Sequence, residues 1–299
     1  MPAELDIADF AARFLPQLEA CLLTQKLSEP YAAPEALAAA MRHGALNGGK
    51  RLRPLLVVET AGVFDMPEAD AMPAAVAVEL VHCFSLVHDD LPAMDDDDLR
   101  RGKPTVHKAF DEATAILAGD ALHSRAFAIL AGDRAHPDPS VRMALVTELA
   151  MAAGAGGMAG GQQRDLEGER GGFSNADIAQ MQMMKTGALI RAAVRMGALI
   201  GGAAPDAMAA LTLYGEAAGR AFQLADDILD LTATPEQMGK ATHKDDARNK
   251  PTLLARIGLD AAQRHLGDHI HRAISALSVF GHEADGLRAI ARYFAVRDK

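Results

Sequence analysis

Two clusters of aspartate, each at the end of an apolar run, are the residues of this chain best suited to chemistry. The first begins at Asp89-Asp90 and continues through Asp95 to Asp98, and the second is Asp226-Asp227-Ile-Leu-Asp230. Acidic side chains are costly beside apolar runs unless something positive binds there. Mg²⁺ takes oxygen ligands, commonly one or two carboxylates together with substrate phosphates. The clusters therefore predict a site for several Mg²⁺ ions and a phosphorylated substrate.

The second cluster has the geometry of a single helix face. At the helical repeat, four polar side chains share a face about 100° wide: Gln223, Asp226, Asp227 and Asp230. Like charges at this spacing destabilise a bare helix. A solvated acidic face would carry interleaved Lys or Arg, and none lies between Arg220 and Lys240. We therefore interpret this face as metal-binding.

The first cluster is less regular. The six-residue step from Asp89 to Asp95 would place the two on different faces of a helix, and Pro92 disfavours an undisturbed helix there. Convergence requires a bulge or helix end between Asp90 and Asp95. A calcium loop starting at Asp95 would need Glu at its twelfth position, which is Val106. A solvated charge run at a helix end remains the alternative.

Two cationic segments could bind an anion. Arg100 and Arg101 directly follow the first cluster, and Arg makes bidentate contacts to phosphate, although here it could also simply neutralise the aspartates. Upstream, Gly48 to Arg53 places three cations within four residues after a glycine pair, which suits an anion site. This is not a nucleotide-binding P-loop, because Arg51 stands where Ser or Thr is required and the preceding segment is helical in pattern.

Three isolated residues could also contribute to a binding or catalytic site. His82 lies seven residues before Asp89 and shares its helix face, although such a His is more often a packed core residue. Lys185 interrupts an apolar run, and a buried Lys needs an anionic partner. Lys240 follows the second cluster by ten residues and could reach over it.

The elements that position these residues are predicted to be helices. Ala, Leu and Met are abundant, β-branched residues are sparse, and apolar spacing is helical nearly throughout, as in Phe10, Phe14 and Leu18. Turn signals divide the chain into about ten helices, with no convincing alternating strand. No linker separates two halves. If both aspartate clusters serve one site, residues 1–299 form one all-α domain.

Composition excludes several classes of protein. The excess of 40 acidic over 30 basic residues gives a net charge of −10, which disfavours nucleic-acid binding. Cys21 and Cys83 alone provide no disulfide framework. The start of the chain is acidic, unlike a secretory signal, and the longest apolar stretch, 74–87, is interrupted by Glu79 and His82. We therefore expect a cytoplasmic protein with no membrane span.

Together these motifs resemble those of the trans-prenyltransferases, the short-chain polyprenyl diphosphate synthases. The matching segments are GGKRLRP at 48–54, HDDLPAMDDDDLRRGKPTVH at 88–107, GGQxxDL at 160–166, KTGALIRAA at 185–193 and FQLADDILD at 222–230. The resemblance covers nearly the whole chain, and this order of motifs is highly specific. It is strongest to the bacterial farnesyl diphosphate synthase branch.

The resemblance implies an isoprenoid-synthase-type helical bundle, a homodimer, with a deep central cavity. It also implies Mg²⁺-dependent, head-to-tail condensation of isopentenyl diphosphate with dimethylallyl and geranyl diphosphate. The products would be farnesyl diphosphate and diphosphate. Geranyl and geranylgeranyl diphosphate synthases of the same family remain alternatives.

The family pattern also implies roles for individual residues. About three Mg²⁺ ions would be held by the carboxylates, with Asp89, Asp95 and Asp226 as direct ligands beside Asp90, Asp227 and Asp230. The allylic diphosphate would be held by Arg100, Lys185 and Lys240, and isopentenyl diphosphate by Lys50, Arg53, His82 and Arg101. Thr186 and Gln223 would lie beside the allylic carbon. Phe84, five residues before Asp89, would stop the growing chain at fifteen carbons, unless it is only a core residue.

One segment departs from the family pattern, and other protein classes compete. The late loop reads Asn249-Lys250-Pro251-Thr252 where the family usually has Gly-Lys-x-Thr, which leaves the details of loop closure open. A terpene cyclase would want a different second metal motif and aromatic walls, whereas this chain has no Trp and 4% aromatic residues. A non-catalytic partner subunit would tend to lose the Asp motifs. An acidic helical scaffold or calcium-binding protein leaves Lys50, Arg53 and Lys185 unexplained.

Overall fold

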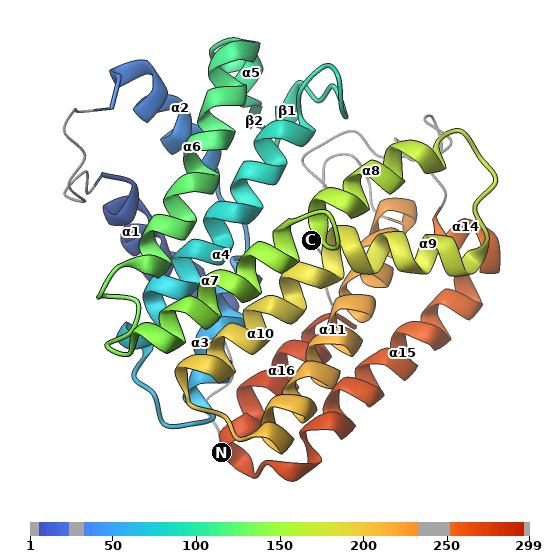
Figure 1. The fold of residues 1–299 in the computed structure, drawn as a ribbon. Coiled ribbons are helices and arrows are strands. Elements are labelled where there is room, and N and C mark those ends of the chain that lie inside the picture. The colour runs from blue at the N-terminus through green and yellow to red at the C-terminus, as the bar shows by residue number, and fades with distance from the viewer. Residues whose placement is uncertain (1–5, 24–32, 233–251, 296–299) are drawn as a thin grey trace.

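The computed structural model describes residues 6–23, 33–232 and 252–295, and these are almost entirely helical, as predicted (Figure 1). The first half contains α1 (Ile7–Leu23), α2 (Glu35–Ala45), α3 (Leu52–Gly62), α4 (Glu68–Asp89), α5 (Val106–Ala109), α6 (Glu112–Ala131) and α7 (Pro139–Ala153). The second half contains α8 (Met158–Gly168), α9 (Asn175–Gln182), a π-helical turn η1 (Met183–Gly187), α10 (Ala188–Ile200), α11 (Pro205–Thr232), α14 (Leu253–Ile257), α15 (Leu259–Ala276), the 3₁₀ turns η2 (Leu277–Val279) and η3 (His282–Ala284), and α16 (Asp285–Tyr293).

A small β-hairpin follows α4 and was not predicted. Strands β1 (Leu99–Arg100) and β2 (Lys103–Pro104) pair antiparallel, with Arg100 opposite Lys103. The turn residues Arg101 and Gly102 both have positive φ, 54° and 77°, as the favoured two-residue hairpin turn requires. Two-residue strands are too short to produce an alternating pattern, which explains why the sequence did not reveal them.

The helices that carry the aspartate clusters belong to the centre of the bundle. α4 packs against α3 and α6, while α10 packs against α3, α7 and α11 (Figure 1). α15 covers the outer side of α11, and the α11 residue Tyr214 is fully buried and donates a hydrogen bond to the Leu287 carbonyl of α16 at 2.7 Å. The core therefore holds α4 and α11, the two helices on which the first and second aspartate clusters begin.

Two helical stretches have the length and hydropathy of membrane spans, contrary to the expectation from sequence. The most apolar window of α4 has a mean hydropathy of 1.5 and is 61% buried. The second stretch, Pro139–Gly168, joins α7 to α8 and is 33% buried. Glu79 and His82 do not shorten α4, because both side chains are accommodated inside the bundle. The burial of α4 among α3 and α6 is that of a core helix.

Candidate active site

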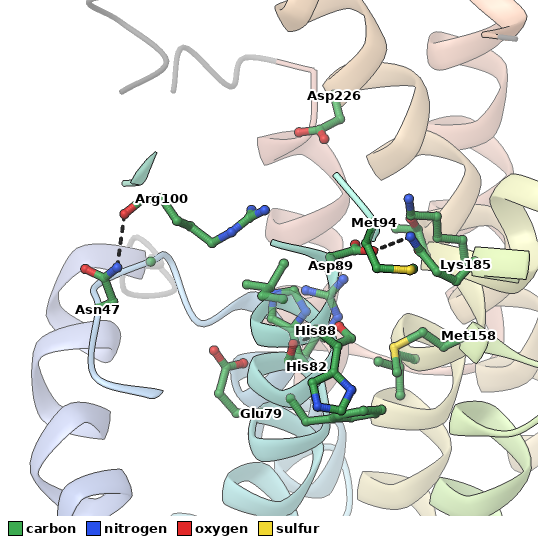
Figure 2. A pocket seen from close by; sticks show the side chains of 18 of the residues that line it. Asn47, Glu79, His82, His88, Asp89, Met94, Arg100, Met158, Lys185 and Asp226 are labelled. Carbon is green, nitrogen blue, oxygen red and sulfur yellow. Dashed lines mark hydrogen bonds between the residues drawn. The ribbon is translucent and has the colours of Figure 1, made fainter. Parts of the chain in front are cut away.

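A cavity of about 1000 Å³ opens between α4, α11, α8, η1 and the loop before α3 (Figure 2). Basic residues named from the sequence line one part of it: Lys50, Arg53, His82, Arg100 and Arg101. Other predicted site residues also line it: Phe84, Asp89, Lys185, Thr186, Gln223 and Asp226. Segments more than 170 residues apart, the loop at Lys50 and the cluster at Asp226, thus meet at one cavity.

Four of the predicted aspartates are not among the lining residues: Asp90, Asp95, Asp227 and Asp230. Lys240 and residues 249–251 of the unusual late loop lie outside the described residues. Of the residues that the structure describes, the predicted basic residues and two of the six aspartates thus lie at the cavity wall, and the other aspartates have different surroundings.

The first aspartate cluster contains the helix end that the sequence required. α4 ends at Asp89, and the chain then folds back, so that the Asp95 amide donates to the Asp89 carbonyl at 2.7 Å. The Asp97 amide likewise donates to the Asp90 carbonyl at 3.2 Å. Asp95 is thereby held beside the end of α4, close to Asp89 in space despite the six-residue separation.

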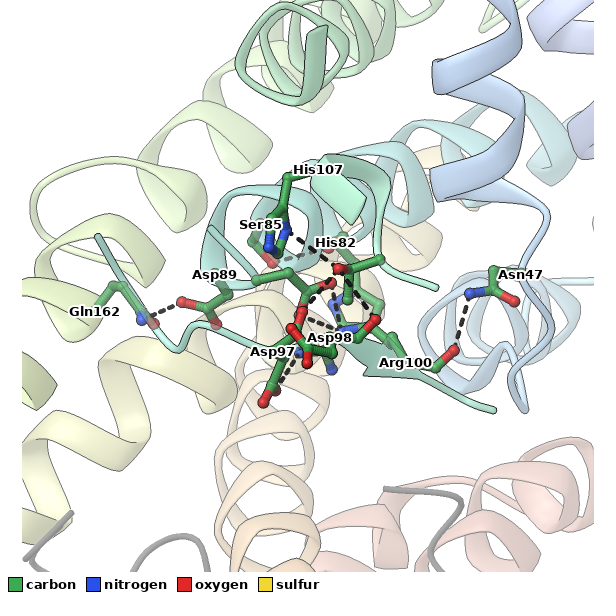
Figure 3. A network of polar contacts seen from close by, with 11 residues as sticks. Asn47, His82, Ser85, Asp89, Asp97, Asp98, Arg100, His107 and Gln162 are labelled. Atoms are coloured by element: carbon green, nitrogen blue, oxygen red, sulfur yellow. Dashed lines mark hydrogen bonds and ion pairs between the residues drawn. The ribbon is translucent and has the colours of Figure 1, made fainter. Parts of the chain in front are cut away.

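Asp89 and Asp226 approach the cavity from different helices, α4 and α11 (Figure 2). The Asp89 carboxylate accepts a hydrogen bond from the Gln162 side-chain amide of α8 (Figure 3). Gln162 belongs to the GGQxxDL segment, to which the sequence had assigned no role. Its contact fixes one carboxylate oxygen and orients the other.

Asp90 and Asp227 are buried and orient neighbouring side chains. Asp90 is 3% exposed and binds Arg100 through two oxygens, with Nη2–Oδ1 at 2.5 Å and Nε–Oδ2 at 2.9 Å. Burial raises the pKa of Asp90 and outweighs the opposing effect of Arg100. Asp227 accepts hydrogen bonds from Gln182 and Gln223, each at 2.8 Å. Both expected roles of Arg100 are therefore compatible with its position: it neutralises Asp90 while lining the cavity.

The carboxylates fit Mg²⁺ bound together with a phosphorylated ligand better than a closed metal site. Within the residues that the structure describes, no group of three His, Cys, Asp or Glu side chains converges on one point. Mg²⁺ commonly uses only one or two carboxylates and completes its octahedron with water and substrate phosphate. Asp89 and Asp226 on facing walls of the cavity supply such a partial donor set.

The basic part of the cavity is desolvated and electrostatically strained. Burial lowers the pKa of Arg53 and of Arg101, and neighbouring arginines add to both shifts. The pKa of His82 is lowered well below 6.5 by burial and then by Arg53, Arg101, Arg100 and Arg51. Aromatic rings flank two of the cations, with Lys50 Nζ 5.1 Å from the Tyr293 ring centre and the Arg53 guanidinium 5.9 Å from that of Phe222. A bound anion would relieve this repulsion.

Lys185 has the anionic partner that its apolar surroundings require. It lies in the π-helical turn η1, and its Nζ bonds Asp165 Oδ2 of α8 at 2.6 Å. α8 approaches η1 so closely that a Cβ on Gly161 would meet the Lys185 amide nitrogen at 2.1 Å. π-helical turns within α-helices are frequent at functional sites. Asp165 was missed as a site residue, although it lies in the same sequence segment as Gln162.

Phe84 lines the cavity and has an aromatic layer behind it. Its ring makes edge contacts with His88 at 5.2 Å and with His123 at 4.8 Å, measured between ring centres. His123 makes a further edge contact with Phe127 at 5.0 Å. Phe84 is therefore both a cavity wall and part of the packing between α4 and α6, so the two interpretations made from sequence are not exclusive.

The depressed pKa of His82 predicts sensitivity to acid. As pH falls below 6.5, the unfolded chain binds a proton at His82 before the native protein does, so the free energy of unfolding must decrease. Chemical denaturation between pH 7 and about 5 should show this decrease, and His82→Gln should reduce its slope. The exposed His282→Gln variant is the control. Superimposable pH profiles for wild type and His82→Gln would contradict the prediction.

Comparisons with known proteins identify the family of this chain. Residues 34–279 match the polyprenyl synthetase family. Farnesyl diphosphate synthase of Geobacillus stearothermophilus is 40% identical over 297 residues, covering 99% of each chain. The crystal structure of a FPP/GFPP synthase from Zymomonas mobilis superposes with a TM-score of 0.83 at 42% identity, covering 96% of this chain and 98% of that one.

A third comparison includes bound ligands. The structure of a geranyltransferase from Helicobacter pylori, complexed with magnesium and isoprenyl diphosphate, gives a TM-score of 0.82 at 28% identity and covers 98% of each chain. The fold, the motif residues around one cavity and the family match over most of the sequence lead to one conclusion. This chain belongs to the polyprenyl synthetase family of prenyltransferases.

Proposed function

We propose that this short-chain prenyl diphosphate synthase is a farnesyl diphosphate synthase. It would condense isopentenyl diphosphate with dimethylallyl diphosphate and then with geranyl diphosphate. The observation that carries the proposal is a single cavity with carboxylates at Asp89 and Asp226, a cationic cluster beside them and the Phe84 ring as a further wall. The predicted homodimer and cytoplasmic location stay predictions.

The allylic diphosphate would bind between the two aspartate helices. Asp89, Asp95 and Asp226 would hold Mg²⁺, about three ions in all, which neutralises the charge that develops on the leaving diphosphate. Arg100, fixed by Asp90, and Lys185, fixed by Asp165, would bind the same diphosphate oxygens. Because these donors are already oriented before the substrate binds, they stabilise the departing charge with little reorganisation.

Isopentenyl diphosphate would bind in the basic part of the cavity, at Lys50, Arg53, His82 and Arg101. The allylic C–O bond breaks to leave a carbocation and diphosphate. The isopentenyl double bond then attacks the cation, and a proton leaves to the released diphosphate. Thr186 and Gln223, which both line the cavity, would present oxygen atoms to the reacting carbons, and Gln223 is held in place by Asp227. No protein nucleophile is required. Water must be excluded, because it would capture the cation.

The decisive experiment is a product assay. Purified protein is incubated with Mg²⁺, isopentenyl diphosphate and, separately, dimethylallyl, geranyl or farnesyl diphosphate, and products are identified by mass. A fifteen-carbon product from the first two primers, with little extension of the third, supports the proposal. Extension of farnesyl diphosphate would make it a synthase of longer products. No condensation by folded protein would favour a cyclase or a non-catalytic subunit.

Replacing Phe84 should change product length. In Phe84→Ala the cavity would open toward His88 and His123, and the growing chain could extend by another five-carbon unit. We expect the main product to shift from fifteen to twenty carbons or more, measured by mass spectrometry. Phe127→Ala is the control, because this ring packs behind His123 and is not a lining residue. An unchanged product distribution in Phe84→Ala would show that Phe84 only packs the core.

A further inference from the structure

The strongest unassigned feature is a buried ion pair in the wall of the cavity, beside the cationic residues Lys50 and Arg53. Arg51 Nη1 bonds Glu79 Oε1 of α4 at 2.5 Å, with the two side chains 1% and 3% exposed. The second guanidinium nitrogen, Nη2, donates to the Ala45 carbonyl at the end of α2, at 2.9 Å. One side chain thereby ties the end of α2, the start of α3 and the middle of α4 together. Nothing in the proposed reaction uses either charge directly.

The backbone at Arg51 needs this restraint. Arg51 precedes the first residue of α3 with a φ of 52°, a left-handed conformation that is unfavourable for a residue with a side chain. Gly48 and Gly49 before it have φ of 74° and 107°, so the loop between α2 and α3 is tightly wound. Such conformations persist where surrounding contacts determine them. The contacts of the Arg51 side chain to Glu79 and to the Ala45 carbonyl hold the backbone in this conformation.

The restrained loop carries the residues that line the basic part of the cavity. Lys50 and Arg53 flank Arg51 on either side and both line the cavity. Arg101 of the hairpin turn donates to the Gly48 carbonyl in the same loop. All three cations of this motif therefore border the cavity, but Arg51 is 3% exposed as a residue and its guanidinium is bound to Glu79, which also lines the cavity.

Stability alone does not account for such a pair. Replacing a buried ion pair by apolar residues of similar volume is often neutral or stabilising, because the desolvation of both charges is avoided. We propose that Arg51 and Glu79 are positioning residues for the binding of isopentenyl diphosphate. They set the conformation of the loop so that Lys50 and Arg53 meet the diphosphate together. This inference rests on the proposed function, because it takes isopentenyl diphosphate as the ligand of that part of the cavity.

The double variant Arg51→Met/Glu79→Leu separates positioning from stability. We expect a melting temperature close to that of the wild type, and a KM for isopentenyl diphosphate raised about tenfold or more. The KM for geranyl diphosphate should change little. The single variant Glu79→Gln would leave a charged Arg51 without its ion pair and should be much less stable, so it cannot replace the double variant. The partly buried pair Arg195–Glu148, which joins α10 to α7, supplies the matched control Arg195→Met/Glu148→Leu.

Calorimetry with isopentenyl diphosphate, in the absence of Mg²⁺, tests the two proposals separately. No binding to the wild type would overturn the proposed function. Binding to the wild type and equally to the folded Arg51→Met/Glu79→Leu variant would overturn the positioning role. The positioning role would also be overturned if the Arg51→Met/Glu79→Leu variant raised the KM for geranyl diphosphate as much as that for isopentenyl diphosphate. The same holds if the Arg195→Met/Glu148→Leu control raised the KM for isopentenyl diphosphate to the same extent.

Discussion

Asp89→Asn and Asp226→Asn should each lower kcat about 1000-fold, because each removes a carboxylate that would hold Mg²⁺ against the leaving diphosphate. Asparagine preserves size and most polar contacts, so the change is mainly one of charge. The KM for isopentenyl diphosphate should change little, since its proposed site is formed by Lys50, Arg53 and His82 on another part of the cavity wall. Steady-state kinetics at several Mg²⁺ concentrations measures both quantities, and part of the lost activity should return at high Mg²⁺.

Two neighbouring aspartates provide controls for this prediction. Asp98 belongs to the same acidic run, but its side chain is 75% exposed and pairs with Lys108 at 2.9 Å, so Asp98→Asn should keep nearly full activity. Asp227 is 7% exposed and accepts two glutamine amides, so Asp227→Asn should lower stability as well as activity. If Asp98→Asn were as damaging as Asp89→Asn, total acidic charge and not the cavity geometry would matter.

The sequence predicted which face of a helix carries the functional side chains. It did not predict which side chain on that face reaches the cavity. Helical spacing correctly placed the second cluster on one helix, because a period of 3.6 residues fixes direction within an element. It could not separate Asp226, which lines the cavity, from Asp227, which is held by Gln182. That distinction depends on the end of α9, where Gln182 lies and whose position is set by tertiary packing.

The residues that the sequence analysis missed, Asp165 and Glu79, were missed for one physical reason: each acts on a partner that is remote in sequence. Asp165 faces Lys185 across two elements, and Glu79 faces Arg51 across 28 positions, so no local periodicity links either pair. The need for an anion near Lys185 could be deduced from the cost of burying a charge, but not which residue would supply it. By contrast, the helix end after Asp89 could be predicted, since Pro92 and the convergence of the aspartates are local constraints.

Lys185→Met should lower kcat about 100-fold or more, since it removes a fixed positive charge that, in the proposed reaction, would stabilise the departing diphosphate. The apolar stem is retained, so packing within η1 is mostly preserved. The variant leaves Asp165, 5% exposed, without its ion pair, and some loss of stability is therefore expected. Asp165→Asn should have a smaller effect, about tenfold, because the Lys185 charge remains and only its orientation is lost.

The two variants differ in what they predict for binding. In Lys185→Met the KM for geranyl diphosphate should rise together with the loss of kcat, whereas the KM for isopentenyl diphosphate should stay near the wild-type value. Arg191→Met is the control, because Arg191 lies one helical turn beyond η1 in a half-exposed pair with Glu216 at 3.5 Å and does not line the cavity. Folded Lys185→Met protein with activity within threefold of the wild type would contradict a role for this side chain at the allylic diphosphate. The ion pair between Lys185 and Asp165 would then serve only to join η1 to α8.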